Sequence, residues 1–200
     1  MLDLDGILLA AGESRRMGYP KPLLKIGDQL FIERAIETMR GAAERLIVVL
    51  GAHAERIRAC VTTEQAIVLV ENPNYRRGQL SSLKAGLARV RPNAAGVIVH
   101  LADHPMVQAA TFATLKRQYE STGKPLAIAR YQGRRGHPVI FGRALFNELM
   151  SAPEERGARV VVNADPSRVA YADVDDSGVV LDLDTPGDLA RVGLPPPPFE

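Results

Sequence analysis

The chain has 200 residues, of which 46% are hydrophobic and 24% charged, a composition typical of one globular domain with a sizeable core. A formal net charge of only +2 and the absence of tryptophan argue against a nucleic-acid-binding surface. No apolar run reaches the roughly 18 residues of a membrane span, and the single cysteine, Cys60, excludes an internal disulfide framework. We therefore expect a cytoplasmic protein that binds neither nucleic acid nor membrane.

Short apolar runs alternate with amphipathic segments through the first two thirds of the chain. The apolar runs are rich in β-branched residues and predict strands over residues 6–10, 46–50, 67–70, 97–101 and 126–129. The amphipathic segments between them predict helices over residues 31–40, 54–60, 80–90 and 111–119. This alternation is typical of a parallel sheet covered by helices on both faces, which places the fold in the α/β class.

From residue 133 onward the pattern changes. A strand is predicted over residues 138–141, a helix over 144–150, and further short elements over 160–163, 169–173 and 179–182. We expect antiparallel strands here that form a lid over the substrate. Thr185 and Pro186 then open a last helix over residues 187–192, with Thr185 as its N-cap. Residues 1–194 are expected to form a single domain, followed by a proline-rich tail over residues 195–200.

The first predicted strand runs into a loop that combines the small residues Gly12, Ser14 and Gly18 with the cations Arg16 and Lys21. Small residues let backbone N–H groups approach a ligand closely, and clustered cations attract a polyphosphate. The spacing matches neither the P-loop nor the dinucleotide-binding fingerprint. The sequence therefore indicates an anion site of another kind; the alternative is a glycine-containing turn with solvated charges.

Asp103 comes just after the strand predicted over residues 97–101, at the sheet edge where ligands of parallel sheets bind. A carboxylate in this position is suited to hold a divalent cation. The alternative is an aspartate that caps the next helix. His100 and His104 flank Asp103 and raise zinc as a further option, although two histidines and one aspartate are not a specific zinc signature.

Two more carboxylates, Asp182 and Asp184, alternate with leucines near the end of the chain. On a strand this alternation puts both carboxylates on one face. Magnesium usually takes one or two carboxylates together with substrate phosphates, so Asp103 could share a magnesium ion with one of them. The sequence does not decide between Asp182 and Asp184, and we expect Asp184.

A turn over residues 72–78 leads into a helix that begins near Ser81 and Ser82. The free N–H groups of such a helix start attract anions or base carbonyls, whereas N-capping alone would also explain the serines. Gly86 inside this helix costs about 1 kcal/mol relative to alanine, so a close packing contact is expected there. Further along, His137 lies on a turn with two arginines that either faces substrate or is a charged hairpin.

With these clusters in order, the chain resembles the MobA-like nucleotidyltransferases, and within them the molybdenum cofactor cytidylyltransferase (MocA-like) branch. Five motifs occur in the family's order, at residues 9–21, 78–87, 102–105, 136–138 and 182–186, and the match extends from residue 7 to about residue 192. The resemblance implies a Rossmann-like, three-layer α/β/α fold with a mostly parallel sheet and a small antiparallel addition. It also implies Mg²⁺-dependent transfer of a nucleotidyl group from a nucleoside triphosphate, with release of pyrophosphate.

The family pattern assigns roles to matching positions of this chain. The implied catalytic residues are Arg16, Lys21 and Asp103. The implied nucleotide-binding residues are Ala10, Ala11, Gly12, Ser14, Arg16, Lys21, Gly78 and Ser82. Asp103 and Asp184 are the implied metal ligands, and Gly136, His137 and Pro138 lie where the branch binds its acceptor.

The nucleotide and the acceptor follow from the branch that the chain resembles. Guanylyltransferase relatives typically have glycine at the position of Ala11, so Ala11 favours CTP. The implied acceptor is molybdopterin or the molybdenum cofactor, with a molybdenum hydroxylase or its chaperone as a partner. The alternatives are a guanylyl- or sugar-phosphate nucleotidyltransferase, and a non-catalytic nucleotide- or cofactor-binding accessory protein.

Overall fold

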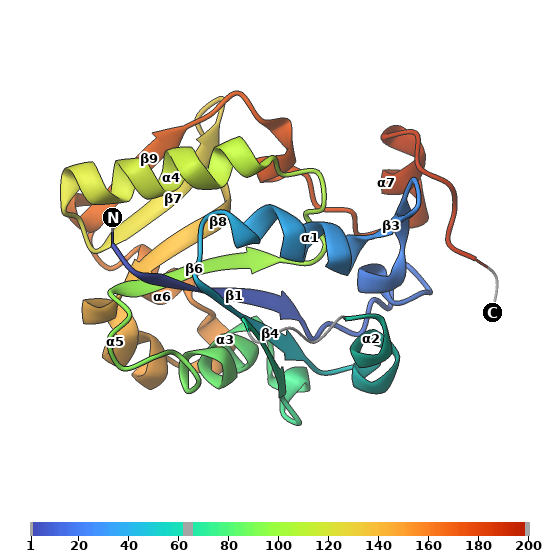
Figure 1. Ribbon diagram of the computed structural model, residues 1–200, viewed down its shortest axis with the longest axis horizontal. Helices are drawn as coiled ribbons and strands as arrows, with labels where there is room; N and C mark the ends of the chain where they lie inside the picture. Colours follow the sequence, from blue (N-terminus) through green and yellow to red (C-terminus); the bar gives the residue numbers. More distant parts are fainter. Residues whose placement is uncertain (1, 62–65, 199–200) are drawn as a thin grey trace.

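A seven-stranded sheet forms the centre of the computed structural model, which describes residues 2–61 and 66–198 (Figure 1). Its strand order is β5-β4-β1-β6-β8-β7-β9. The strands are β1 (Leu4–Ala10), β4 (Arg45–Leu50), β5 (Ile67–Glu71), β6 (Gly96–Leu101), β7 (Leu126–Tyr131), β8 (Arg134–Gly142) and β9 (Val169–Asp173). A separate antiparallel pair consists of β2 (Lys25–Ile26) and β3 (Gln29–Leu30).

Helices cover both faces of this sheet, which confirms the expected three-layer α/β/α architecture (Figure 1). One apolar layer includes side chains of α1 (Phe31–Arg40), α2 (Ala54–Cys60) and α4 (Ala109–Thr122). The opposite layer includes α3 (Gln79–Leu87), α5 (Phe146–Ser151) and α6 (Arg159–Val162). Strand β1 is buried along its whole length because its side chains point alternately into the two layers. Among the described helices, none is long and apolar enough to cross a lipid bilayer.

The expected lid of antiparallel strands is wrong. Strand β8 runs antiparallel between β6 and β7 inside the main sheet, and β9 pairs with β7 in parallel. The reason is burial: β8 places Val139, Ile140 and Phe141 in the core, where a solvent-facing lid would have exposed them. Residues 160–163 fall largely in α6. Residues 179–182 form no strand: the first two end a 3-10 turn, Ser177–Val180, and the other two follow it.

The order of the strands creates a binding crevice at one edge of the sheet. From β1 the chain adds β4 and then β5 on one side, and it then crosses to β6 on the other side of β1. Ligands of open α/β sheets bind where the strand order reverses in this way, at the carboxyl ends of the strands. The segments that follow β1 and β6 touch directly there, since the Ala102 N–H donates to the carbonyl of Leu9 at 3.0 Å.

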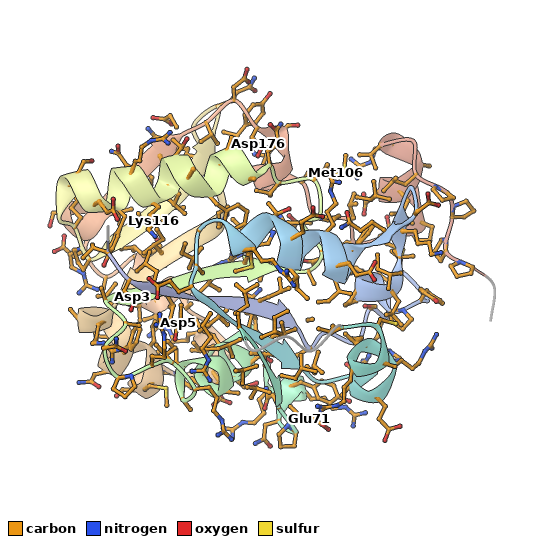
Figure 2. The ribbon with its side chains drawn as sticks, viewed as in Figure 1. Asp3, Asp5, Glu71, Met106, Lys116 and Asp176 are labelled. Carbon is orange, nitrogen blue, oxygen red and sulfur yellow. The ribbon has the colours of Figure 1, made fainter. Side chains whose placement is uncertain are left out.

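The C-terminal segment is fixed to this edge by Asp176. Figure 2 shows Asp176 near the start of α4, with Met106 close by. One carboxylate oxygen of Asp176 accepts from the Gln108 N–H at 2.9 Å and from the Thr111 hydroxyl at 2.6 Å. A β-carbon on Gly178 would lie 2.6 Å from the backbone of Met106, so glycine permits this close approach.

A small apolar cluster carries the segment on to the crevice. It comprises Leu183, which is fully buried, together with Met17, Leu24, Phe31 and Leu189. The Leu183 N–H also donates to the carbonyl of Asp103 at 3.2 Å. Beyond it, α7 (Pro186–Arg191) begins with the predicted N-cap, because the Thr185 hydroxyl accepts from the Asp188 N–H. Of the expected proline-rich tail, residues 195–198 are described and residues 199–200 lie outside the described part.

The close contact predicted at Gly86 is present. A β-carbon at this position would lie 2.8 Å from Cγ2 of Ile7 and 3.1 Å from Cγ2 of Val49. Gly86 therefore lets α3 lie directly on β1 and β4, which brings the start of α3 to the crevice.

Replacing Gly86 with alanine is expected to destabilise the protein despite the better helix propensity of alanine. Overpacking typically costs about 1–3 kcal/mol, and the gain in propensity of at most about 1 kcal/mol does not offset it fully. Gly187→Ala in α7 is the matched control, since its β-carbon would meet only the Thr185 hydroxyl at 3.7 Å. Urea unfolding of both variants measures the difference; equal free energies of unfolding would contradict the packing account.

Candidate active site

A cavity of about 330 Å³ opens at the carboxyl edge of the sheet, between the segments that follow β1 and β6. Every residue expected to bind nucleotide or metal lines it: Ala10, Ala11, Gly12, Ser14, Arg16, Lys21, Gly78, Ser82, Asp103 and Asp184. These residues come from four segments distant in sequence. The structure therefore assembles them into one concave site.

The loop after β1 is folded around Ser14. Ser14 adopts a left-handed conformation with φ of 54°, and its carbonyl accepts from the N–H groups of Met17 and Gly18. Its hydroxyl accepts from the Lys21 N–H at 3.0 Å, which fixes the start of the 3-10 turn Lys21–Leu23. A β-carbon on Gly12 would meet nothing within 4 Å, so the loop backbone faces open space at Gly12. The turn thus presents Lys21 to the cavity and leaves the backbone accessible.

Lys21 joins the two expected metal ligands. Its ammonium donates to Oδ2 of Asp103 at 2.5 Å and to Oδ1 of Asp184 at 2.7 Å. Its side chain is 13% exposed, and those of Asp103 and Asp184 are 26% and 24% exposed. Burial alone would lower the pKa of Lys21, but the two carboxylates outweigh it and raise that pKa. Burial would likewise raise the pKa of Asp184, yet Lys21 and Arg16 hold it below its ordinary value.

Arg16 supplies a second cation on the open side of the site. Its guanidinium donates to Oδ2 of Asp184 at 2.7 Å, while its side chain remains 71% exposed. The free face of the guanidinium is therefore available to a ligand in the cavity.

The structure argues against two other interpretations of the segment around Asp103. Asp103 is not a helix cap, because α4 begins at Ala109 with Gln108 at the N-cap position. His100 is buried against Phe112, with ring centroids 5.0 Å apart, as expected for a core histidine. Within residues 2–61 and 66–198, no three histidine, cysteine or acidic side chains are grouped so that they could hold a metal ion. That finding argues against a zinc site of the H-x-x-D-H type.

The geometry separates Asp184 from Asp182. Asp182 turns away to the imidazole of His104, with Oδ1 3.1 Å from Nε2, and this hydrogen bond lowers the pKa of Asp182. Asp182 and Asp184 do not share the face of a strand, because their segment is an irregular loop held by Leu183. His104 is buried, which by itself would lower its pKa, but Asp182 and the charge of Asp103 raise it above the ordinary value.

Helix α3 points its first turn at the cavity. Gly78, with φ of 106°, is the N-cap residue, so neither serine caps this helix. Asn72, buried below the turn, donates through its amide to the hydroxyls of Ser81 at 2.9 Å and Ser82 at 3.0 Å. Because the Ser82 oxygen accepts this bond, its own hydrogen is left to donate elsewhere. Ser82 therefore presents a hydrogen-bond donor at the cavity wall.

The motif expected to bind the acceptor does not line the cavity. Gly136, His137 and Pro138 belong to β8. A β-carbon on Gly136 would overlap the Val179 carbonyl oxygen, so this glycine packs against the segment that leads to Asp184. The His137 ring lies 5.5 Å from that of His104, and its Nδ1 is buried without a hydrogen-bond partner among the described residues.

Sequence reasoning missed several residues at the site. Tyr75 and Gln79 line the cavity, and both lie next to Gly78 and Ser82 in the same turn and helix start. The Asp188 carboxylate accepts from the N–H groups of Asp184 and Thr185, at 3.0 and 2.7 Å. The spacing of Thr185 and Asp188 is that of a capping box and could have revealed this anchor.

The donor set fits magnesium. Two carboxylates converge on one ammonium, which marks a position that already favours a cation. Magnesium prefers hard oxygen ligands, and one or two carboxylates plus substrate phosphates complete its shell. Asp103 and Asp184 are the residues that would hold it, and the nearby cavity has room for the phosphates.

Comparison with known proteins gives consistent results. Residues 6–170 match the family model of the MobA-like NTP transferase domain. The molybdenum cofactor cytidylyltransferase of Escherichia coli K12 is 24% identical over 190 residues, which is 94% of this chain and 95% of that protein. A probable molybdenum cofactor guanylyltransferase of Opitutus terrae is 30% identical over 115 residues, covering 57% of this chain and 54% of that protein.

Solved structures extend the similarity to three dimensions. The crystal structure of Rv0371c from Mycobacterium tuberculosis H37Rv matches with a TM-score of 0.82 and 34% identity, over 96% of this chain and 97% of that chain. A structure of Rv0371c in complex with manganese matches with a TM-score of 0.78 and 32% identity, over 95% and 97%. Nearly the whole of each chain is therefore covered by a common fold.

The buried His137 predicts a pH-dependent stability. Burial, reinforced by the nearby His104, lowers the pKa of His137 from 6.5 to about 4. Between these values the unfolded chain binds a proton that the folded chain does not, so stability falls as the pH falls through this window. We expect the melting temperature to drop less between about pH 7 and pH 5 in His137→Gln than in the original protein.

The difference between the two proteins at each pH reports His137 together with its interaction with His104, whose raised pKa makes a contribution of opposite sign. Parallel pH profiles for the original protein and the variant would contradict a neutral, buried His137.

Proposed function

The chain belongs to the MobA-like NTP transferase family, and we propose that it transfers CMP from CTP to a phosphorylated acceptor in a Mg²⁺-dependent reaction that releases pyrophosphate. One observation carries the proposal. Two carboxylates from distant segments, Asp103 and Asp184, converge on one cation at the wall of a cavity that Arg16 and a helix start also line. Such a site suits a polyphosphate with its metal better than an uncharged ligand.

The reaction requires positioning and charge neutralisation more than covalent chemistry by the protein. An oxygen of the acceptor phosphate forms a bond to the α-phosphorus while the bond from that phosphorus to the bridging oxygen of pyrophosphate breaks. Negative charge develops on the leaving pyrophosphate and the α-phosphoryl oxygens, and cations aimed at these oxygens lower the barrier. Bound magnesium supplies part of this neutralisation.

The chain's own residues divide the remaining work. Lys21 and Arg16 line the cavity, where they can donate to the triphosphate. Each already lies 2.7 Å from a carboxylate oxygen of Asp184. The open backbone beyond Ala11 accommodates a ligand at Gly12 without steric hindrance. In such sites, holding the reactants in line lowers the activation barrier by at most about 10 kcal/mol.

The preference for CTP rests on Ala11 and Ser82. Both residues line the cavity, and Ala11 carries a methyl group that a glycine at this position would lack. A methyl group there leaves less room than glycine and favours the smaller pyrimidine base. The hydroxyl hydrogen of Ser82 is oriented by Asn72 and suits a base acceptor such as the O2 or N3 atom of cytosine.

The proposed acceptor is the phosphate of a molybdopterin-type compound. A molybdenum hydroxylase or its chaperone is the proposed partner that receives the product, and the proposed location is the cytoplasm. This part rests on the molybdenum cofactor cytidylyltransferase that the chain resembles over 94% of its length. Gly136, His137 and Pro138 are proposed to serve the acceptor side of the site.

A guanylyltransferase is the second candidate, because the relative from Opitutus terrae carries that name. A sugar-phosphate nucleotidyltransferase and a non-catalytic nucleotide-binding accessory protein are the third and fourth candidates. A pyrophosphate-release assay with each nucleotide and with molybdopterin or sugar phosphates separates them. Nucleotide binding without turnover on any acceptor would favour the accessory protein.

Asp103→Ala tests the proposed metal site. Removing one well-placed electrostatic group costs about 10²–10³-fold in rate in comparable sites. We expect such a loss in pyrophosphate release with the folded state retained, as judged by circular dichroism. Asp182→Ala is the matched control, because Asp182 points to His104 and not to Lys21. A nearly unchanged rate for Asp103→Ala would remove Asp103 from the site.

A thermal-shift screen with Mg²⁺ tests the base preference. Ligand at 100 times its dissociation constant stabilises a protein by about 2.7 kcal/mol, which raises the melting temperature. We expect CTP to raise it more than GTP, ATP or UTP. Ala11→Gly should raise the shift with GTP relative to that with CTP, because it removes the methyl group from the cavity wall. Equal shifts for all four nucleotides would contradict the cytidine preference.

A further inference from the structure

The Lys21 ammonium occupies the point on which the metal-binding carboxylates converge. It lies 2.5 Å from an oxygen of Asp103 and 2.7 Å from an oxygen of Asp184. Two carboxylates this close to one point repel each other unless a cation lies between them. In the nucleotide-free protein, Lys21 supplies that cation.

Lys21 is held in this position from both ends. Its backbone N–H donates to the Ser14 hydroxyl at 3.0 Å, and its side chain is only 13% exposed. Arg16 does not share this role, because its guanidinium contacts the other oxygen of Asp184, and its side chain is 71% exposed. A divalent cation that bound to the same oxygens would meet the positive charge of Lys21 at close range, which is strongly unfavourable.

A triphosphate changes this balance. Lys21 and the Gly12 region line the same cavity, so phosphates bound there offer the ammonium a second anionic partner. Once Lys21 turns to the phosphates, the oxygens of Asp103 and Asp184 are free to bind a metal ion.

We propose that Lys21 acts as an internal counter-cation that blocks the metal position until a nucleoside triphosphate draws it away, so that metal and nucleotide bind together. The nucleotide half of this proposal rests on the proposed function; the competition between Lys21 and metal does not. If bound nucleotide raises the affinity for metal by some factor, bound metal must raise the affinity for nucleotide by the same factor.

The test measures Mn²⁺ binding to the nucleotide-free protein by the electron paramagnetic resonance signal of free Mn²⁺. Lys21→Met removes the ammonium and keeps a similar apolar stem. We expect this variant to bind Mn²⁺ at least about tenfold more tightly than the original protein, because a repulsive charge and a competing ligand are both lost. A gain of affinity cannot result from misfolding, which would only lose the site.

Four further variants sharpen the result. Lys25→Met removes an exposed lysine outside the cavity and should leave Mn²⁺ affinity unchanged. Lys21→Arg retains a cation and should show no gain. The double variant Lys21→Met with Asp184→Asn should lose the gain, because a carboxylate that the metal needs is removed. Lys21→Gln repeats the test with a polar side chain if the methionine variant fails to fold.

Unchanged or weaker Mn²⁺ binding by folded Lys21→Met and Lys21→Gln would overturn the proposal. The outcome is separable from that of the proposed function. If pyrophosphate release occurs but neither variant gains Mn²⁺ affinity, the counter-cation is wrong and the transferase stands. If the variants gain affinity but no nucleotide is turned over, the counter-cation stands and the transferase is wrong.

Thermal shifts test the link to nucleotide. In the original protein, Mn²⁺ with CTP should raise the melting temperature by more than the sum of the two shifts measured separately. In Lys21→Met, Mn²⁺ alone should raise it appreciably, and the excess over the sum should shrink. Additive shifts in the original protein would contradict the coupling.

Discussion

The repulsion between two carboxylates is the constraint on which this site depends. Asp103 and Asp184 lie 81 residues apart in sequence, yet both approach one ammonium within 2.7 Å. Two partly buried anions can be held this close only if a cation offsets their repulsion and the backbone cannot relax. Both conditions are met here, and most of the structure around the cavity serves one of them.

The backbone condition is met by anchors outside the cavity. Strand β6 ends at Leu101, and the Ala102 N–H bonds to β1, so Asp103 starts from a fixed edge of the sheet. Asp184 does not follow a strand, and three contacts fix its position instead. Leu183 is fully buried, Asp176 is bonded to the start of α4, and Asp188 accepts from the Asp184 N–H. These contacts set the distance between the carboxylates before any ligand binds.

Much of this site could be predicted from the sequence because its parts are local. Alternation of strands and helices identified the sheet edge, and each motif falls within a few residues of a strand or helix end. Two features were not predictable in this way. The choice between Asp182 and Asp184 depends on the contact of Asp182 with His104. That contact is made in the folded protein, and the alternation of aspartates and leucines in the sequence does not reveal it. The position of β8 depends on its pairing with β6 and β7. The apolar pattern of its sequence fits a strand in a lid as well as a strand in the main sheet, so the pattern alone does not place it.

The position of β8 also connects Gly136 to the segment that carries Asp184. Because β8 lies inside the sheet, Gly136 meets the Val179 carbonyl, three residues before Asp182. Any side chain there would push the Ser177–Val180 turn outward, and with it the loop that carries Asp184. Gly136 therefore helps to set the position of Asp184 through backbone packing. Strand β8 is thereby coupled to the distance between the two carboxylates, because a displacement at Gly136 would move the segment that leads to Asp184.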